Sequence, residues 1–229
     1  MDKISVLIPT IQKNEKVLTK LLKILKKDKV VSEILIINNA IKNFEKIIPD
    51  EKVKIYTPNE NYYVNYAWNI GVKLLENEKF LIINDDILCC ENFCSLILET
   101  GILDKETTGL VGLNPASIAQ NSRETVKDIS VPKIDKHFKL LLEPMPNYMM
   151  TGDWGSAYFG KKQNYYSIPV DLKIIYGDNY LLYKNLQNGK TNYKISGLPF
   201  NHIHSLSSAS PEFSAVIASD IKNSKKYFN

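Results

Sequence analysis

The sequence predicts an α/β fold with a mostly parallel central sheet, flanked by helices, and a smaller mixed part toward the C-terminal end. In residues 4–84, continuous Ile/Val/Leu runs alternate with segments of helical period, a pattern typical of parallel strands that are buried on both faces. The chain has 229 residues and 44% apolar content, which is enough for a sizeable core. We therefore expect a single domain over residues 1–229.

The first part of the chain gives the clearest order of elements. Strand-like runs are rich in Ile, Val and Leu, whereas Val17, Leu18, Leu21 and Leu25 recur at helical spacing. Pro58 ends the third strand. The expected elements are a strand over 4–9, a helix over 13–27, strands over 33–38 and 53–58, a helix over 61–75 and a strand over 79–84.

The second part is less regular. A polar segment over about 116–147 has the composition of a loop excursion. Gly189 fits the C-cap of a helix that starts near Asp178. The expected elements are a helix over 92–103, a strand over 109–115, a short strand within 137–143, a strand over 155–162, a helix over 177–190 and a helix over 212–228.

Composition excludes several classes. The net charge of +4 comes from scattered lysines, with Arg123 as the one arginine, so we expect no nucleic-acid partner. Cys89, Cys90 and Cys94 form neither a disulfide framework nor a zinc spacing. The N-terminus enters a strand without a signal sequence, and no apolar run reaches the ~20 residues of a membrane span. These features predict a cytoplasmic protein without a transmembrane segment; peripheral membrane contact and oligomeric state stay open.

The stretch LIINDDILCC (81–90) interrupts an apolar run with Asn84, Asp85 and Asp86. Burying charge costs several kcal/mol unless the charge is paired or binds a cation. In parallel sheets, ligands bind beyond the carboxyl ends of the strands, so we expect these acids to face a cleft there. Polar residues end the earlier strands as well: Pro9, Thr10, Asn38 and Asn39.

Six segments together resemble a known family: ISVLIPT, EILIINNA, NYAWNIGVKLL, FLIINDDI, YGDNYLL and HIHSLSS. In this order they resemble the family-2 group of GT-A nucleotide-sugar glycosyltransferases, whose D-x-D motif ends the fourth strand. The resemblance runs from Ile4 to about Ser208. It implies a Rossmann-like GT-A domain, with a nucleotide-binding half in 1–115 and an acceptor-binding half in 116–229. It also implies transfer of a sugar to a glycan or lipid-linked saccharide acceptor, in polysaccharide synthesis.

The resemblance assigns roles to individual positions. Asp86 and His204 match metal ligands, while Asp85 would meet the ribose or a metal-bound water. The other donor-site candidates are Pro9, Thr10, Asn38, Asn65, Asn69, Asn84 and Trp154; Asn65 and Asn69 lie on one helical face, and Trp154 lies in a glycine-rich turn that could offer a face to a sugar. Four positions depart from the family's pattern: Asn38, Trp68, Asn84 and Gly177.

The chemistry fits these residue types. A divalent cation stabilises a diphosphate leaving group, and a histidine ligand favours Mn²⁺ over Mg²⁺. The acceptor hydroxyl needs a general base, for which we choose Asp178, with Asp153 in reserve. Because the N-terminal dipole of a helix favours the charged form, the basicity of Asp178 must come from desolvation. One base without a second nucleophile indicates inversion, and we expect a UDP-sugar as donor.

Plainer interpretations stay open. Asp85 and Asp86 could start a turn and cap a helix, and Asp178 could be a plain N-cap. His204 could be a structural residue, and the asparagines of the predicted helix over 61–75 could form a solvated face. Two other functions compete: a nucleotidyltransferase on a similar fold, although PTIQKNEK (9–16) lacks the expected glycine- and basic-rich loop, and a non-catalytic protein that binds a nucleotide sugar or glycan.

Overall fold

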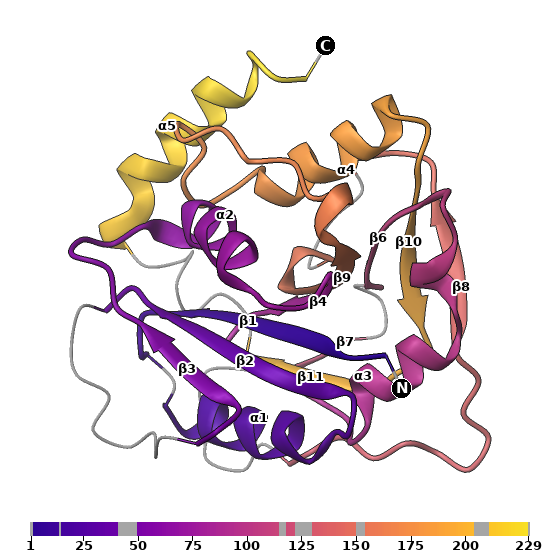
Figure 1. Ribbon diagram of the computed structural model, residues 1–229. Coiled ribbons are helices and arrows are strands. Elements are labelled where there is room, and N and C mark those ends of the chain that lie inside the picture. The colour runs from indigo at the N-terminus through magenta and orange to yellow at the C-terminus, as the bar shows by residue number, and fades with distance from the viewer. Residues whose placement is uncertain are drawn as a thin grey trace.

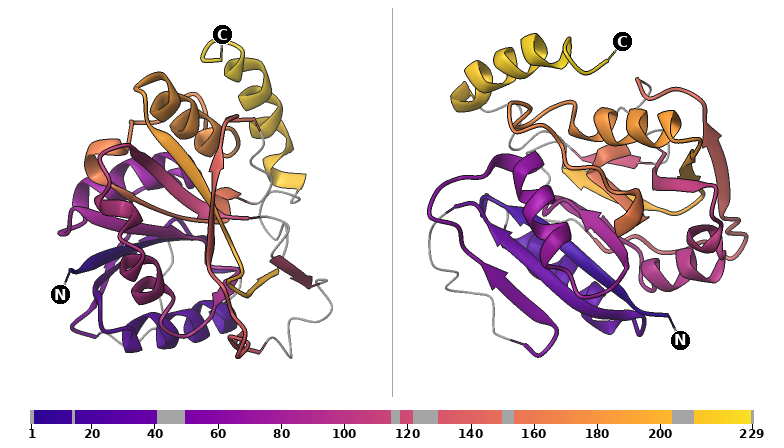
Figure 2. Two further views of the ribbon diagram at one scale, coloured as in Figure 1. Left: turned by 90° about the vertical axis from the view of Figure 1, so that its right-hand side faces the viewer. Right: turned by 45° about the horizontal axis from the view of Figure 1, so that its top comes forward.

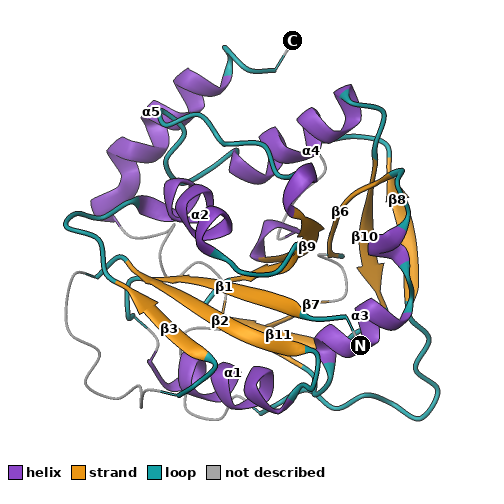
Figure 3. Ribbon diagram, viewed as in Figure 1, coloured by secondary structure: helices purple, strands orange, loops and turns teal. Residues whose placement is uncertain are grey.

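The computed structural model describes residues 2–13, 15–40, 50–114, 118–121, 130–149, 154–203 and 211–228. Two sheets organise these residues, one of eight strands and one of three. The large sheet crosses the centre of the molecule, with helices on both of its faces (Figure 1; Figure 3). The α/β class predicted from the sequence is confirmed.

The large sheet has the strand order β3-β2-β1-β4-β9-β6-β10-β8. β1 is parallel to β2 and β4, and β2 to β3. β9 is antiparallel to both β4 and β6, while β10 is parallel to β6 and antiparallel to β8. All strands except β9 and β8 therefore run the same way. Their bounds are β1 (Ile4–Thr10), β2 (Val31–Asn38), β3 (Val53–Tyr56), β4 (Lys79–Ile83), β6 (Thr108–Leu113), β8 (Leu141–Met145), β9 (Ala157–Lys161) and β10 (Thr191–Ser196).

Alternation along the strands explains the layers. In β1, Val6 and Ile8 pack with the helix α1, whereas Leu7 points to the other face and packs with α2, as the period of two in a strand requires. Figure 2 shows these helices on opposite sides of the sheet. No helix in the described ranges is long and apolar enough to cross a membrane. The helices are α1 (Glu15–Lys27), α2 (Tyr63–Leu74), α3 (Phe93–Glu99), α4 (Gly177–Gln187) and α5 (Ser214–Ser224).

The small sheet has the order β5-β11-β7, formed by β5 (Ile87–Cys89), β11 (Phe200–Ile203) and β7 (Ile118–Asn121). β11 is antiparallel to β5, with His202 opposite Ile87. β5 begins directly after Asp86, so this pairing brings a late segment of the chain to the acids that follow β4. These three strands and β10 were not predicted from the sequence.

The helix α3 is shorter than the segment 92–103 predicts. It ends at Glu99, and Gly101 follows with φ 65°, after which a separate 3-10 turn covers Ile102–Asp104. A left-handed glycine is a common way to end a helix. The start of α3 has no local side-chain cap; instead the buried Asp28 accepts hydrogen bonds from the amides of Cys94 (2.9 Å) and Ser95 (3.1 Å).

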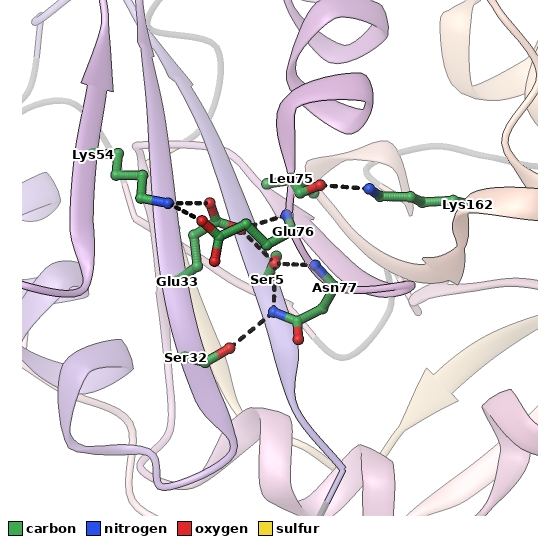
Figure 4. A network of polar contacts seen from close by, with 8 residues as sticks. All are labelled: Ser5, Ser32, Glu33, Lys54, Leu75, Glu76, Asn77 and Lys162. Carbon is green, nitrogen blue, oxygen red and sulfur yellow. Dashed lines mark hydrogen bonds and ion pairs between the residues drawn. The ribbon is translucent and has the colours of Figure 1, made fainter.

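The amino-terminal ends of the parallel strands carry a polar network (Figure 4). The buried Glu33 in β2 accepts hydrogen bonds from the Ser5 hydroxyl (2.6 Å) and the Glu76 amide (2.9 Å), and pairs with Lys54 at 3.2 Å. Asn77 donates to the same Ser5 oxygen at 2.8 Å. Burial opposes ionisation of Glu33, but these partners outweigh it and hold the pKa of Glu33 below its ordinary value.

Candidate active site

The ends of β1, β2 and β4 meet at the carboxyl edge of the large sheet, as the sequence predicts. The hydroxyl of Thr10, at the end of β1, donates a short hydrogen bond to the carboxylate of Asp85, just beyond β4. The Thr10 hydroxyl also accepts the Gln12 amide at 2.9 Å, and its carbonyl accepts the Asn39 amide at 2.8 Å. Thr10 therefore joins the three strand ends and orients one of the two neighbouring acids.

Asp86 faces a histidine from β11. Its Oδ1 lies 3.5 Å from Nε2 of His202, and both side chains are buried, at 9% and 4% exposure. The main chain reinforces this approach, because the Ile203 amide donates to the Asp86 carbonyl at 3.0 Å. Among the described residues, Asp86 Oδ1 accepts no hydrogen bond. A buried carboxylate oxygen without a donor, beside an imidazole nitrogen, is a donor set that suits Mn²⁺.

Asp85 experiences two effects that oppose its charge. Burial, and then the neighbouring Asp86, raise the pKa of Asp85 to about 7, although the Thr10 hydroxyl acts in the other direction. A divalent cation beside the pair would remove this repulsion. Within the described residues, however, no group of three His, Cys, Asp or Glu side chains surrounds a common point. A metal held here would need further oxygens, such as those of a diphosphate and water.

The residues expected at the nucleotide base lie at the same edge. Pro9 is buried in β1 opposite Ile37. The amide of Asn38 is held between two side chains, because its Oδ1 accepts Gln12 Nε2 at 2.8 Å and its Nδ2 donates to the Thr57 hydroxyl at 3.1 Å. Asn38 is itself buried, and these two contacts fix its amide. The roles of Pro9 and Asn38 stay predictions.

The two asparagines of α2 bind the protein's own backbone. Nδ2 of Asn69 donates to the Ile168 carbonyl (2.8 Å), while its Oδ1 accepts the Ile168 amide (2.9 Å) and the Tyr165 hydroxyl (3.0 Å). Nδ2 of Asn65 donates to the carbonyls of Leu172 (3.1 Å) and Ile175 (3.3 Å). Both asparagines are buried, so they form neither a solvated face nor a surface for the donor. We leave both out of the proposed donor site.

Trp154 is a core residue. It is fully buried, its indole Nε1 donates to the Tyr193 carbonyl at 3.1 Å, and its ring stacks on Tyr158 with centroids 5.2 Å apart. Its other surroundings include Gly112, where a Cβ would come 2.1 Å from the indole. This packing leaves no face for a sugar, so we assign Trp154 a packing role. Trp68 is also buried, edge-on to Tyr158.

Asp178 lies in the first turn of α4 and is partly buried. Its Oδ1 accepts the Asn179 amide at 2.9 Å, and the Gly155 amide also donates to the carboxylate. Burial outweighs these amides and raises the pKa of Asp178 to about 6. The desolvation that a base requires is thus present, although the Asn179 contact also fits the capping interpretation, and both stay open.

Backbone contacts connect Asp178 to the edge of the sheet. Gly155 lies so close that a Cβ there would be 2.5 Å from Asp178 Oδ2, and only glycine allows this approach. The next residue, Ser156, accepts the Asn84 amide on its carbonyl at 2.9 Å. Asn84 therefore contributes main chain to the site, and its side-chain role stays a prediction.

Asp153 and His204, the reserve base and the expected second metal ligand, lie outside the described residues. The sequence pointed to His204 as the metal ligand, yet His202 is the histidine that the structure places at Asp86. Alternation in an extended segment puts side chains two residues apart on the same face. That spacing was the available signal, but the sequence did not reveal the pairing of β11 with β5.

No protein-family model matches the sequence, and no curated protein matches it either. Solved structures do. GalNAc-T7 with UDP, GalNAc and Mn²⁺ superposes with a TM-score of 0.65 at 13% identity, over 96% of this chain and 47% of that one. The chain has the GT-A fold.

Two structures of S. aureus TarS 1–349 share the GT-A fold of this chain. TarS alone gives a TM-score of 0.55 at 17% identity, over 88% of this chain and 60% of that one. Its complex with UDP gives 0.57 at 18% identity, over 95% and 64%. The chain thus spans less than two thirds of the length of these neighbours. At such identities the similarity establishes the fold alone, and the site must be argued from its own residues.

Proposed function

We propose that the chain is an inverting, metal-dependent glycosyltransferase that moves a sugar from a nucleoside-diphosphate sugar, with UDP as the nucleotide, to a hydroxyl of a glycan or lipid-linked saccharide. One observation carries the proposal: the buried Asp86 Oδ1 accepts no hydrogen bond from the described residues and lies 3.5 Å from His202 Nε2, at the carboxyl edge of a GT-A sheet. Ligands of open α/β sheets bind at this edge.

Asp86 and His202 would hold the cation, with His204 as a further predicted ligand. When bound, the metal supplies Lewis-acid stabilisation of the diphosphate leaving group. The neighbour GalNAc-T7, solved with UDP and Mn²⁺, supports the choice of Mn²⁺, with Mg²⁺ as the alternative. Asp85, oriented by Thr10, would accept a hydrogen bond from the ribose or from a metal-bound water.

Asp178 is the proposed general base, with Asp153 in reserve. The acceptor oxygen forms a bond to the anomeric carbon as the bond from that carbon to the diphosphate oxygen breaks. The diphosphate leaves with the electron pair, and Asp178 takes the acceptor's proton. A pKa of about 6 leaves most of this carboxylate ionised at neutral pH while keeping it more basic than an ordinary aspartate. Attack opposite the leaving group inverts the anomeric centre.

Two departures from the family's pattern have a packing explanation, which weakens the non-catalytic alternative. A Cβ at Gly177 would come 2.1 Å from Asn65 Oδ1, so glutamate has no room there. Trp68 fills the core between α2 and β9, edge-on to Tyr158. Neither change removes a group from the Asp86–His202 pair or from Asp178.

The test is a thermal-shift panel of UDP, GDP, CMP and dTDP sugars with and without Mn²⁺, followed by donor hydrolysis with the best binder. We expect a UDP-sugar to raise the melting temperature only with Mn²⁺, by mass action on the folded state, and to be hydrolysed slowly. Asp86→Ala should lose both effects. The control Glu91→Gln, at an exposed residue nearby in sequence, should keep them. Full activity of Asp86→Ala in saturating Mn²⁺ would contradict the proposal, and Mn²⁺-dependent binding of UDP-sugars without hydrolysis would favour the non-catalytic alternative.

A further inference from the structure

The C-terminal helix α5 contributes a buried carboxylate to the loop that leads into α4. Asp220 is 0% exposed. Its Oδ1 accepts the Lys173 amide at 2.9 Å, and its Oδ2 accepts the amides of Ile174 at 2.7 Å and Ile175 at 3.0 Å. Three successive backbone donors on one carboxylate form a strong anchor, because charge-assisted hydrogen bonds are short and about twice as strong as neutral ones. The loop is thus fixed by its main chain.

The same loop is held from its other side by Asn65 of α2. The Asn65 amide donates to the Lys173 carbonyl at 3.1 Å, and its side chain donates to the carbonyls of Leu172 and Ile175. Residues 172–175 therefore lie between Asp220, which accepts hydrogen bonds from three of their N–H groups, and Asn65, which donates hydrogen bonds to three of their carbonyls. In Figure 1 this segment passes between α5 and α2 before it enters α4.

The loop delivers the chain to Asp178 with little freedom. Tyr176 adopts a left-handed conformation with φ 64°, which is uncommon for a residue other than glycine and needs support from its surroundings. Gly177 then lies against Asn65, without room for a Cβ. Asp178 follows at once, with Gly155 against its carboxylate. Any loosening of residues 172–175 is thus transmitted to Asp178 within three residues.

Attachment of α5 alone does not require Asp220. Asp171 already binds the end of the chain, because its carboxylate accepts Lys226 Nζ at 2.9 Å and the Tyr227 hydroxyl at 2.5 Å. Asn223 also donates to the Asp171 carbonyl at 2.9 Å. A buried carboxylate is a costly way to fasten a helix, whereas it is well suited to fix three amides directly before a catalytic group.

We propose that Asp220 is a positioning residue, which acts through the amides of residues 173–175 to hold Asp178 in its productive orientation. This inference rests on the proposed function, in which Asp178 is the base. It gives α5, a different helix from the one that carries Asp178, a positioning role in the proposed reaction.

The test compares Asp220→Asn with Tyr227→Phe, which breaks the contact between the segment after α5 and Asp171, directly before the loop, but leaves the three amides bound. In donor hydrolysis with the UDP-sugar chosen from the panel and Mn²⁺, Asp220→Asn should lower kcat by about 10- to 100-fold, as expected when a reacting group is misplaced by about 1 Å, with a smaller change in KM. In the pH profile of donor hydrolysis, the fall in rate on the acid side should move to a pH below about 6, because a looser loop admits water to Asp178 and lowers the pKa of its carboxyl. Tyr227→Phe should leave kcat and this acid limb unchanged.

A second measurement can be made on the wild-type protein and extended to the variant. In the wild-type protein, hydrogen exchange should show the amides of residues 173–175 protected, and in Asp220→Asn this protection should be lost selectively. Fast exchange of these amides in the folded wild type would overturn the inference, even if Asp220→Asn failed to fold. So would a wild-type kcat and pH limb in Asp220→Asn while Asp178→Asn is inactive. Full activity of Asp178→Asn would instead show that Asp178 is not the base, which is the part of the proposed function on which this inference rests.

Discussion

Acids lie at both ends of the large sheet, but their hydrogen-bond partners and the direction of their pKa shifts differ. At the amino-terminal end, Glu33 has a hydroxyl, an amide and an ammonium group as partners, and its pKa is held low. At the carboxyl end, the pKa of Asp85 is raised to about 7 and Asp86 Oδ1 accepts no hydrogen bond from the described residues. The same strands β1, β2 and β4 supply both ends.

The difference separates stabilising from ligand-binding polar groups. A satisfied buried acid stabilises the fold, and losing one partner of such a network is expensive. Two adjacent acids with an unfilled acceptor lower stability, and such strain is typical of functional sites. Substitutions at the two ends should therefore separate stability from activity, as the following predictions state.

The largest expected effect is on activity at the carboxyl end. Asp178→Asn should lower kcat by about 10²- to 10⁴-fold, since it removes a general base. In the wild type, kcat/KM should fall as the pH drops below about 6, because protonated Asp178 cannot take a proton. The pH profile of donor hydrolysis measures this limb. Unchanged kcat in the variant would indicate that Asp153, and not Asp178, is the general base.

The next largest effect is on stability at the amino-terminal end. Glu33→Ala should lower the free energy of unfolding by about 3 kcal/mol, because it leaves the Ser5 hydroxyl and Glu76 amide without their acceptor. Specific activity of the folded protein should not change. Urea denaturation measures the effect, with Glu76→Ala as the matched control: this exposed partner of Lys54 (66% exposed) should cost under about 1 kcal/mol. Equal losses in both variants would show that Glu33 is no anchor.

The smallest effect is a difference in the sign of pH dependence. The lowered pKa of Glu33 contributes stability above pH 4.5 that is lost as the pH falls through the folded-state value, so Glu33→Gln should destabilise least in acid.

Asp178 has its pKa raised from 3.8 to about 6, so its ionisation costs stability as the pH rises through that window. Asp178→Asn should gain stability relative to wild type there, by at most about 3 kcal/mol. Melting curves from about pH 2 to 7 without metal check both slopes; parallel slopes would contradict the comparison.

Much of the first half of the fold could be predicted from the sequence, because β1, β2 and β4 are continuous apolar runs and α1 has one clear apolar face. β10 has a mixed burial pattern, and β11 is only four residues long, so period and length do not distinguish these segments from loops. For the same reason the sequence did not reveal the pairing of His202 with Asp86.

Side-chain roles were harder to predict than elements. Asn65 and Asn69 have the residue type of ligand-binding groups, but they bind backbone carbonyls of residues 168–175, a contact between distant segments. Asp28 and Asp220 likewise serve backbone amides far along the chain. Local spacing cannot identify such partners, since only the tertiary fold brings them together.

The place of β11 between β5 and β7 also affects the order of events during synthesis. Asp86 leaves the ribosome long before His202, and β4 gains its neighbour β9 only after residue 161. A nascent chain that ends near residue 115 would expose one edge of β4 and leave its acids facing water. We therefore predict that the two halves of the sequence do not fold separately, and that a fragment of the first half requires a chaperone or aggregates.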